Sequence, residues 1–186
     1  MSNAAKYILY NDFIIGLLDY NIPDNAGAIY QELFTEFLKL ARRESPFSYI
    51  FKSYEALCRV LARKATYGKR LYQAYQDKDT KTMMVMVEEL QEIKKDLEVF
   101  YDAFRKLWLK DYKGFGFEVM DVRIGGLIAR ISTVTLMLQD YLAGNIEHIY
   151  ELEEERLEYF SGQLKDDEVY APLHGFWASA YTVNHI

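Results

Sequence analysis

Two arginines on one predicted helix are the residues whose types and spacing point most directly to a binding chemistry. Arg123 and Arg130 lie seven residues apart, so they share one helix face, with Gly126 between them on nearly the same face. A guanidinium donates paired hydrogen bonds to carboxylates or carbonyls, and a glycine lets another backbone approach closely. The pattern predicts a contact surface for a partner. The alternative is an internal helix crossing in which the arginines pair with neighbours such as Asp121 or Glu118.

Two other patterns resemble functional motifs but are incomplete. A di-iron site in a helical bundle needs two Glu-x-x-His pairs, whereas His148-x-x-Glu151 is reversed and has no second copy. The pair Gly114-x-Gly116 precedes a predicted helix, where backbone amides can hold a phosphate. However, Val119 stands where a dinucleotide-binding motif has its third glycine, and no strand precedes the pair. We therefore expect no metal and no cofactor.

The acidic run after residue 150 does not predict a catalytic pair. Its members spread around more than one face of a helix, and a carboxylate must be buried or paired with another to have its pKa raised. We expect solvated surface, with Arg156 or Lys165 pairing with part of it. The sequence also lacks an evident Ser/His/Asp set or thiol–His pair, so we expect no catalytic residue in this chain. The run comprises Glu151, Glu153, Glu154, Glu155 and Glu158.

Composition excludes several classes of partner. The chain has 186 residues, 51% of them hydrophobic, and a net charge of −6, which disfavours binding to nucleic acid or to an anionic membrane. No run of about 18 apolar residues is present, so we expect no membrane span. Cys58 is the only cysteine, which excludes an internal disulfide and favours a reducing compartment. We see no secretory signal and expect a cytoplasmic protein.

Hydrophobic periodicity predicts an all-α fold, an antiparallel bundle of about five helices with irregular N- and C-terminal segments. The helix predicted from about residue 24 to 42 should bury Ile29, Leu33, Phe37 and Leu40. A long helix over 46–76 should be followed by one over 80–110. The apolar residues of the latter recur every 3.5 positions from Met86 to Leu107, which predicts antiparallel packing at about +20°. Two more helices are expected over 118–143 and 145–160, with Gly144 ending the first of them.

The chain also contains a stretch that resembles a known family. Phe115-Gly-Phe-Glu-Val119 is followed by Asp121, Arg123, Gly125-Gly126 and Arg130, and then by a Glu-Leu-Glu-Glu helix. This stretch is similar to the C-terminal helical domain of bacterial β-N-acetylhexosaminidases in glycoside hydrolase family 20. The segment from Lys6 to Asp19 resembles the connection from the catalytic barrel into that domain. Gly114 departs from the family pattern, which often has a proline there.

The resemblance implies that this chain is a non-catalytic part of a glycosidase that removes terminal β-linked N-acetylhexosamine. The partner would be an upstream catalytic barrel of the same polypeptide, with a homodimer as a further expectation. Residues 1–22 would form the lead-in, with 1–4 as a tag remnant, and residues 23–186 the helical domain. Family 20 enzymes use an adjacent Asp-Glu pair at the end of a barrel strand. Asp167-Glu168 lies in a predicted loop with no strand before it, so it receives no catalytic role.

We expect the interdomain or dimer surface to involve the residues of the resembling stretch, with Gly125-Gly126 at an internal crossing and at least one arginine facing another domain. These interface candidates are Phe115, Phe117, Glu118, Asp121, Arg123, Gly126 and Arg130. Two other readings remain open at this point. One is a stand-alone interaction or regulatory bundle, and the other is a helical sensor domain whose interior cavity, lined by Phe and Tyr, binds an apolar ligand.

Overall fold

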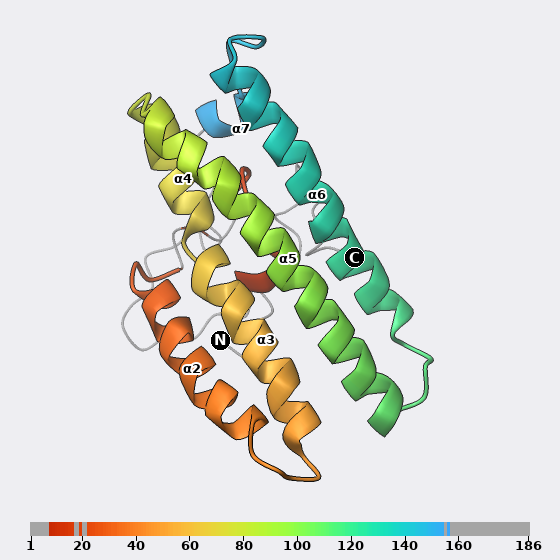
Figure 1. The fold of residues 1–186 in the computed structure, drawn as a ribbon. Helices are drawn as coiled ribbons and strands as arrows, with labels where there is room; N and C mark the ends of the chain where they lie inside the picture. Colours follow the sequence, from red (N-terminus) through yellow and green to blue (C-terminus); the bar gives the residue numbers. More distant parts are fainter. Residues whose placement is uncertain (1–7, 17–18, 20–21, 155, 157–186) are drawn as a thin grey trace, which may run out of the picture.

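The computed structural model describes residues 8–16, 19, 22–154 and 156, and over these residues all regular structure is helical. The all-α prediction is therefore confirmed. Helices α2, α3, α5 and α6 lie side by side in chain order, each antiparallel to the next, and α4 and α7 meet near one end (Figure 1). Their bounds are α2 Ala26–Ala41, α3 Ser48–Lys64, α4 Tyr67–Gln76, α5 Thr80–Asp111, α6 Glu118–Leu142 and α7 Tyr150–Glu153. None of the described helices is long and apolar enough to cross a membrane.

Helix α5 is the central element, and the sequence pattern anticipated it closely. Asp79 caps its first turn by accepting a hydrogen bond from the Thr82 backbone N–H at 3.0 Å. The predicted apolar seam is buried from Met86 through Phe100, and only its last members, Phe104 and Leu107, are half-buried. The seam faces α3 and α6, the two helices that α5 contacts most extensively.

The single helix predicted over 46–76 is wrong, because the chain breaks at Ala65–Thr66 into α3 and α4. Thr66 has φ −106° and ψ 4°, outside the helical region. The break allows Tyr67 to enter the core completely, where its hydroxyl donates to the Met86 carbonyl at 3.0 Å. A buried hydroxyl needs such a partner, and the kink supplies it.

The prediction for the buried face of α2 is also wrong. Ile29 and Leu33 are 44% and 40% exposed, whereas Ala26 and Ala41 are buried. Helix α2 packs on α3 at the edge of the bundle through its small residues: a Cβ placed on Gly27 would lie 2.8 Å from the Ala62 carbonyl oxygen. This close approach sets the rotation of α2 and turns its larger apolar residues away from the core.

The N-terminal segment, residues 8–14, is part of the core. Residues 8–10 are helical, and Ile8, Leu9, Tyr10, Phe13 and Ile14 are all buried against the helices. Figure 1 shows the segment in dark red against the middle of the bundle. The N-terminal segment is therefore a tightly packed part of the core, where the sequence predicted an irregular lead-in.

The region after α6 differs from the predicted fifth helix. Gly144 ends α6 with φ +74°, as predicted, and the Asn145 side chain donates to Asp140 at 3.0 Å. Asn145 therefore closes the end of α6 instead of capping a new helix. The next helix, α7, has four residues. Predictions for the chain beyond residue 156, including Lys165, the Asp167-Glu168 pair and the C-terminal tail, lie outside the described residues.

Candidate functional site: a clamped segment and an apolar groove

The structure separates the predicted interface residues into four groups. Phe117, Glu118 and Asp121 face inward or bind α5 and the turn, and the two arginines, Arg123 and Arg130, face the N-terminal segment. Phe115 points to solvent and is 89% exposed. Gly126 is half-buried, and a Cβ on Gly125 would meet nothing within 4 Å. The expected role of Gly125 in an internal helix crossing is therefore wrong.

The turn between α5 and α6, residues 112–117, is fixed by aromatic packing. Phe117 is buried with its ring centroid 5.8 Å from Phe104 and 5.7 Å from Trp108. The Trp108 indole N–H donates to the Lys113 carbonyl at 2.9 Å. Gly116 has φ +96°, which favours glycine, and its N–H donates to the Glu118 carboxylate at 2.7 Å. The turn therefore has a defined shape.

Asp121 ties the start of α6 to α5. Its carboxylate accepts a hydrogen bond from the Tyr101 hydroxyl at 2.5 Å, and this bond raises the pKa of Tyr101. The same tyrosine ring stacks on Phe117 with centroids 6.1 Å apart. Asp121 thus holds the helix pair together and is not free to pair with the arginines, as the internal-crossing alternative supposed.

Arg130 binds the N-terminal segment through Asp12. Its Nε donates to the Asp12 carboxylate at 2.8 Å, and Asp12 also accepts the backbone N–H groups of Ile14 and Ile15 at 3.0 Å each. Burial raises the pKa of Asp12, but the hydrogen bonds from Arg130 and the backbone outweigh burial and bring this pKa below its usual value. The carboxylate is therefore ionised and paired across 118 positions of sequence.

Arg123 contacts the same segment at Tyr10, two residues before Asp12. Its guanidinium lies 5.5 Å from the centroid of the Tyr10 ring, and the Tyr10 hydroxyl points to the Met120 sulfur at 3.6 Å. Tyr10 is 5% exposed, and its burial raises the pKa of its hydroxyl. A cation over an aromatic face in a desolvated place contributes on the order of 1–2 kcal/mol. Both predicted arginines therefore bind the chain's own N-terminal segment.

Lys64 is the third side chain that binds the N-terminal segment, and sequence reasoning missed it. We call Lys64, Arg123 and Arg130 the clamp. Its Nζ is buried, donates to the carbonyls of Ile8 at 3.2 Å and Asn11 at 2.5 Å, and lies 4.5 Å from the Phe13 ring centroid. Burial lowers the pKa of Lys64 to about 8. A signal was present, because Lys64 follows Leu61 by three positions on the apolar stripe of α3, where a charge needs a partner.

Arg156 approaches the other end of the segment. It is 6% exposed, donates to the Ile14 carbonyl, and lies 4.5 Å from the Tyr72 ring centroid and 3.8 Å from the Asp19 carboxylate. Burial raises the pKa of Asp19 against the opposing effect of Arg156. Arg156 was expected to pair with the acidic run, and the structure instead places it in the core beside the N-terminal segment.

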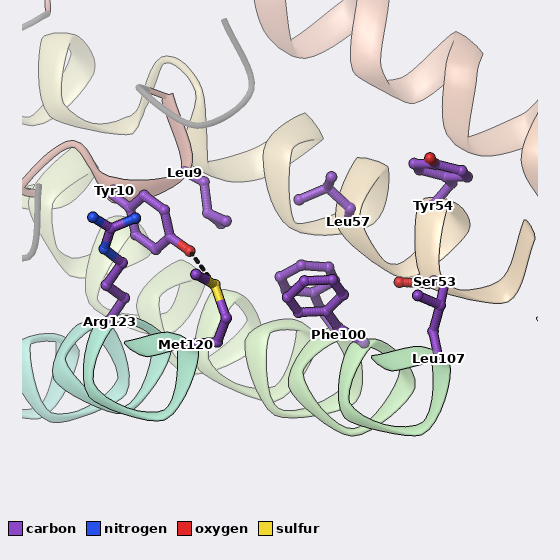
Figure 2. A pocket seen from close by; sticks show the side chains of 10 residues that line it. Leu9, Tyr10, Ser53, Tyr54, Leu57, Phe100, Leu107, Met120 and Arg123 are labelled. Carbon is purple, nitrogen blue, oxygen red and sulfur yellow. Dashed lines mark hydrogen bonds between the residues drawn. The ribbon is translucent and has the colours of Figure 1, made fainter. Parts of the chain in front are cut away.

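A groove opens beside this clamp and has a volume of about 320 Å³. Its walls are mainly apolar and come from the N-terminal segment, α3, α5 and α6: Leu9, Leu57, Phe100, Phe104, Leu107 and Met120. Figure 2 shows Tyr10 and Arg123 at one end of the groove and Ser53 and Tyr54 at the other. Such a groove can accept apolar groups, and its lining holds no carboxylate, histidine or cysteine that could activate the Ser53 hydroxyl. It opens on the surface and is not an enclosed chamber.

No group of three or more potential metal ligands occurs among the described residues. His148 does not pair with Glu151. Its Nδ1 lies 2.7 Å from the Glu153 carboxylate, and this hydrogen bond raises the pKa of His148. The same carboxylate accepts the Tyr75 hydroxyl at 2.7 Å. These contacts link α7 to α4.

A comparison with protein families agrees with the stretch from Phe115 to Arg130 and its helical setting. The model of the Glycoside Hydrolase 20C C-terminal domain matches residues 1–170. The chain belongs to this family. The resemblance to a family 20 C-terminal domain is thereby confirmed, and such a domain implies a catalytic domain in the same polypeptide. No curated protein matches the chain.

Proposed function

We propose that this chain is the non-catalytic helical domain of a cytoplasmic β-N-acetylhexosaminidase and that it packs on the catalytic barrel of the same polypeptide. The family supplies the link to a glycoside hydrolase. The described residues support a structural role, because the charged side chains of Lys64, Arg130 and Arg156 bind the N-terminal segment. Association of two such enzymes as a homodimer is part of the same proposal.

The clamped N-terminal segment is the observation that carries this proposal. A flexible tether leaves two domains free to reorient, whereas a short, rigid connection restricts them. Here Lys64 and Arg130 bind the segment directly, and Ile8 is already buried. A catalytic domain on the N-terminal side of this segment would be attached close to the bundle, and its orientation would be set by the clamp.

The first test is enzymatic. The 186-residue chain alone should not cleave a chromogenic N-acetylglucosaminide, since a catalytic group must be held in position against the substrate and we expect the catalytic residues in the other domain. The polypeptide that includes the catalytic domain should cleave it. Turnover by the isolated chain that disappears on mutating one of its own residues would contradict the proposal.

The second test concerns coupling between the domains. In the two-domain enzyme, Arg130→Ala should leave the buried Asp12 carboxylate without its cation and loosen the N-terminal segment. Calorimetry should then show the helical domain unfolding separately from, and before, the catalytic domain. Lys39→Ala, which removes an exposed Lys39–Glu36 pair, is the matched control and should leave the melting profile unchanged. An unchanged profile for Arg130→Ala would show that the clamp does not couple the domains.

A further inference from the structure

Helix α7 is too short to be stable by itself, so its position depends on contacts with the rest of the bundle. It has four residues, whereas an isolated helix shorter than about 12 residues is marginal in water. Ile149 and Leu152 are buried in the core, and the Gln76 side chain of α4 donates to the Leu152 carbonyl at 2.7 Å. A small set of side-chain contacts therefore holds α7 in place.

The Glu153 carboxylate joins these contacts into one network. It accepts the Tyr75 hydroxyl of α4 at 2.7 Å and lies 2.7 Å from Nδ1 of His148. The Tyr75 hydroxyl in turn accepts the Ile149 backbone N–H at 3.0 Å, and the Tyr75 ring packs on Tyr141 of α6 with centroids 5.0 Å apart. A change in the charge of His148 therefore acts on the bonds that dock α7.

His148 is the member of this network that changes charge near neutral pH. The Glu153 carboxylate raises the pKa of His148, and Glu147, 4.0 Å from Nε2, raises it further. Hydrogen bonds from Tyr75 and His148 lower the pKa of Glu153, and burial raises the pKa of Tyr75 to about 12. Glu153 therefore stays ionised and Tyr75 stays neutral while His148 titrates.

The direction of the pH effect follows from the raised pKa of His148. A charged imidazolium forms a stronger hydrogen bond to a carboxylate than a neutral ring does. Because the pKa is raised in the folded chain, this stabilisation is fully present below the ordinary histidine value of 6.5. It is lost as the pH rises through the pKa of the folded chain.

Arg156 connects α7 to the N-terminal segment. It lies three residues after Glu153, and three residues span about 10 Å at most, so the position of α7 restricts where Arg156 can reach. Its guanidinium donates to the Ile14 carbonyl and lies 3.8 Å from the Asp19 carboxylate. A Cβ on Gly16 would overlap this guanidinium, so Arg156 packs closely against the chain at this point.

We infer that His148, α7 and Arg156 form a proton-sensitive strap on the N-terminal segment. When His148 is charged, its bond to Glu153 holds α7 on α4 and keeps Arg156 on the Ile14 carbonyl. When His148 loses its proton, both contacts loosen. The inference does not depend on the proposed function, since every residue of the strap belongs to this chain.

Amide hydrogen exchange of the 186-residue chain, followed by NMR, tests the inference because it reports local opening. After correction for the intrinsic pH dependence of exchange, the Ile149 and Leu152 amides should exchange about two- to fivefold faster at pH 8 than at pH 6, as expected for loss of one exposed ion pair. The Ile14 amide should follow in the same direction by a smaller factor. The amide of Leu90, buried in α5, is the reference and should not change. Equal corrected rates at the two pH values would overturn the inference.

His148→Gln tests whether the pH response comes from this histidine. A glutamine can still donate to Glu153 but carries no charge, so exchange at Ile149 should become independent of pH. His174 and His185 remain in this variant, so a response that survives in it would come from another group and overturn the inference. Glu147→Gln removes an exposed carboxylate beside His148 and is the matched control, which should keep most of the response.

Arg156→Met tests whether the strap reaches the N-terminal segment. The Ile14 amide should exchange faster in this variant at both pH values and no longer respond to pH, whereas the Ile149 amide should keep its response. An Ile14 amide that still follows pH in the variant would overturn the role of Arg156. Circular dichroism melts check that the variant is folded, and Arg156→Lys, which keeps the charge but loses the planar donors, replaces it if it is not.

The titration of His148 gives a separate measurement on the folded chain. Its pKa, followed by NMR, should lie above 6.5 in wild type and fall towards that value in Glu153→Gln. A glutamine at position 153 can still accept the Tyr75 hydroxyl, so this variant changes the charge beside His148 and keeps that bond. A pKa that is the same in both chains would show that Glu153 does not hold the proton of His148.

Discussion

Lys64 combines an unfavourable burial of charge with hydrogen bonds that hold the N-terminal segment. Its ammonium group is buried, yet it donates to two carbonyls of the N-terminal segment and has Asp12 and Asp19 near enough to favour its charge. Burial outweighs these favourable contacts and lowers the pKa of Lys64 to about 8. The charged amine is thus less stable in the folded chain than in water, although it is the group that fastens the segment.

This lowered pKa has a sign that experiment can check. The pKa of a lysine in the unfolded chain is about 10.4. Between pH 8 and that value the unfolded state binds more protons than the folded state, so Lys64 makes stability rise with pH, by at most about 1.4 kcal/mol per pH unit. Urea unfolding of wild type and Lys64→Met at pH 8.0, 8.7 and 9.4 should show the rise in wild type relative to the variant. Equal slopes would mean that Lys64 titrates as an exposed lysine.

Sequence reasoning identified Arg123 and Arg130 but could not identify what they bind. The seven-residue spacing fixes a shared helix face, which is local information. The partners, Tyr10 and Asp12, are more than 110 positions away, and nothing in the local pattern encodes such pairing. Phe115 and Phe117 show the same limit, because two phenylalanines in one turn look equivalent until the Trp108 and Phe104 packing is known.

At the scale of helices, regular periodicity was predictive where both neighbours of a helix lie close in sequence. The seam of α5 was found because α3 and α6 flank it and bury one continuous stripe. Helix α2 was misjudged because it has one neighbouring helix, α3, and Gly27 contacts it. A helix at the edge of a bundle can bury its small face when backbone approach is more favourable than side-chain burial, and sequence alone does not show this.

Two glycines should respond in opposite ways to alanine. A Cβ on Gly125 in α6 meets nothing within 4 Å, so Gly125→Ala should stabilise the chain by about 0.5–1 kcal/mol through helix propensity. A Cβ on Gly27 in α2 would lie 2.8 Å from the Ala62 carbonyl oxygen, so Gly27→Ala should destabilise it by about 1–3 kcal/mol. Chemical denaturation of both variants provides the measurement, with each serving as the control for the other. Equal effects would contradict the placement of α2.

For the whole molecule, the N-terminal segment, residues 8–14, belongs to the folded unit. Deleting residues 1–14 would remove Leu9, Phe13 and Ile14 from the core and leave Lys64 and Arg130 without their partners. We expect the truncated chain to lose cooperative thermal unfolding, observed by circular dichroism, because several buried side chains of about 1.5–3 kcal/mol each are lost together. Phe13→Ala, which removes a single ring, should lower the melting temperature but retain cooperativity. A truncated chain that melts like wild type would show that the segment is dispensable.

The clamp also determines how the domain would respond to mechanical force. Tension applied through the N-terminus would reach Asp12 and its bond to Arg130, near the middle of α6, while Lys64 shares the load from α3. The N-terminal segment would therefore have to break several contacts on two helices before either helix could peel away. Force on the tether would be resisted collectively, and the bundle would yield in one abrupt step instead of unravelling from one end.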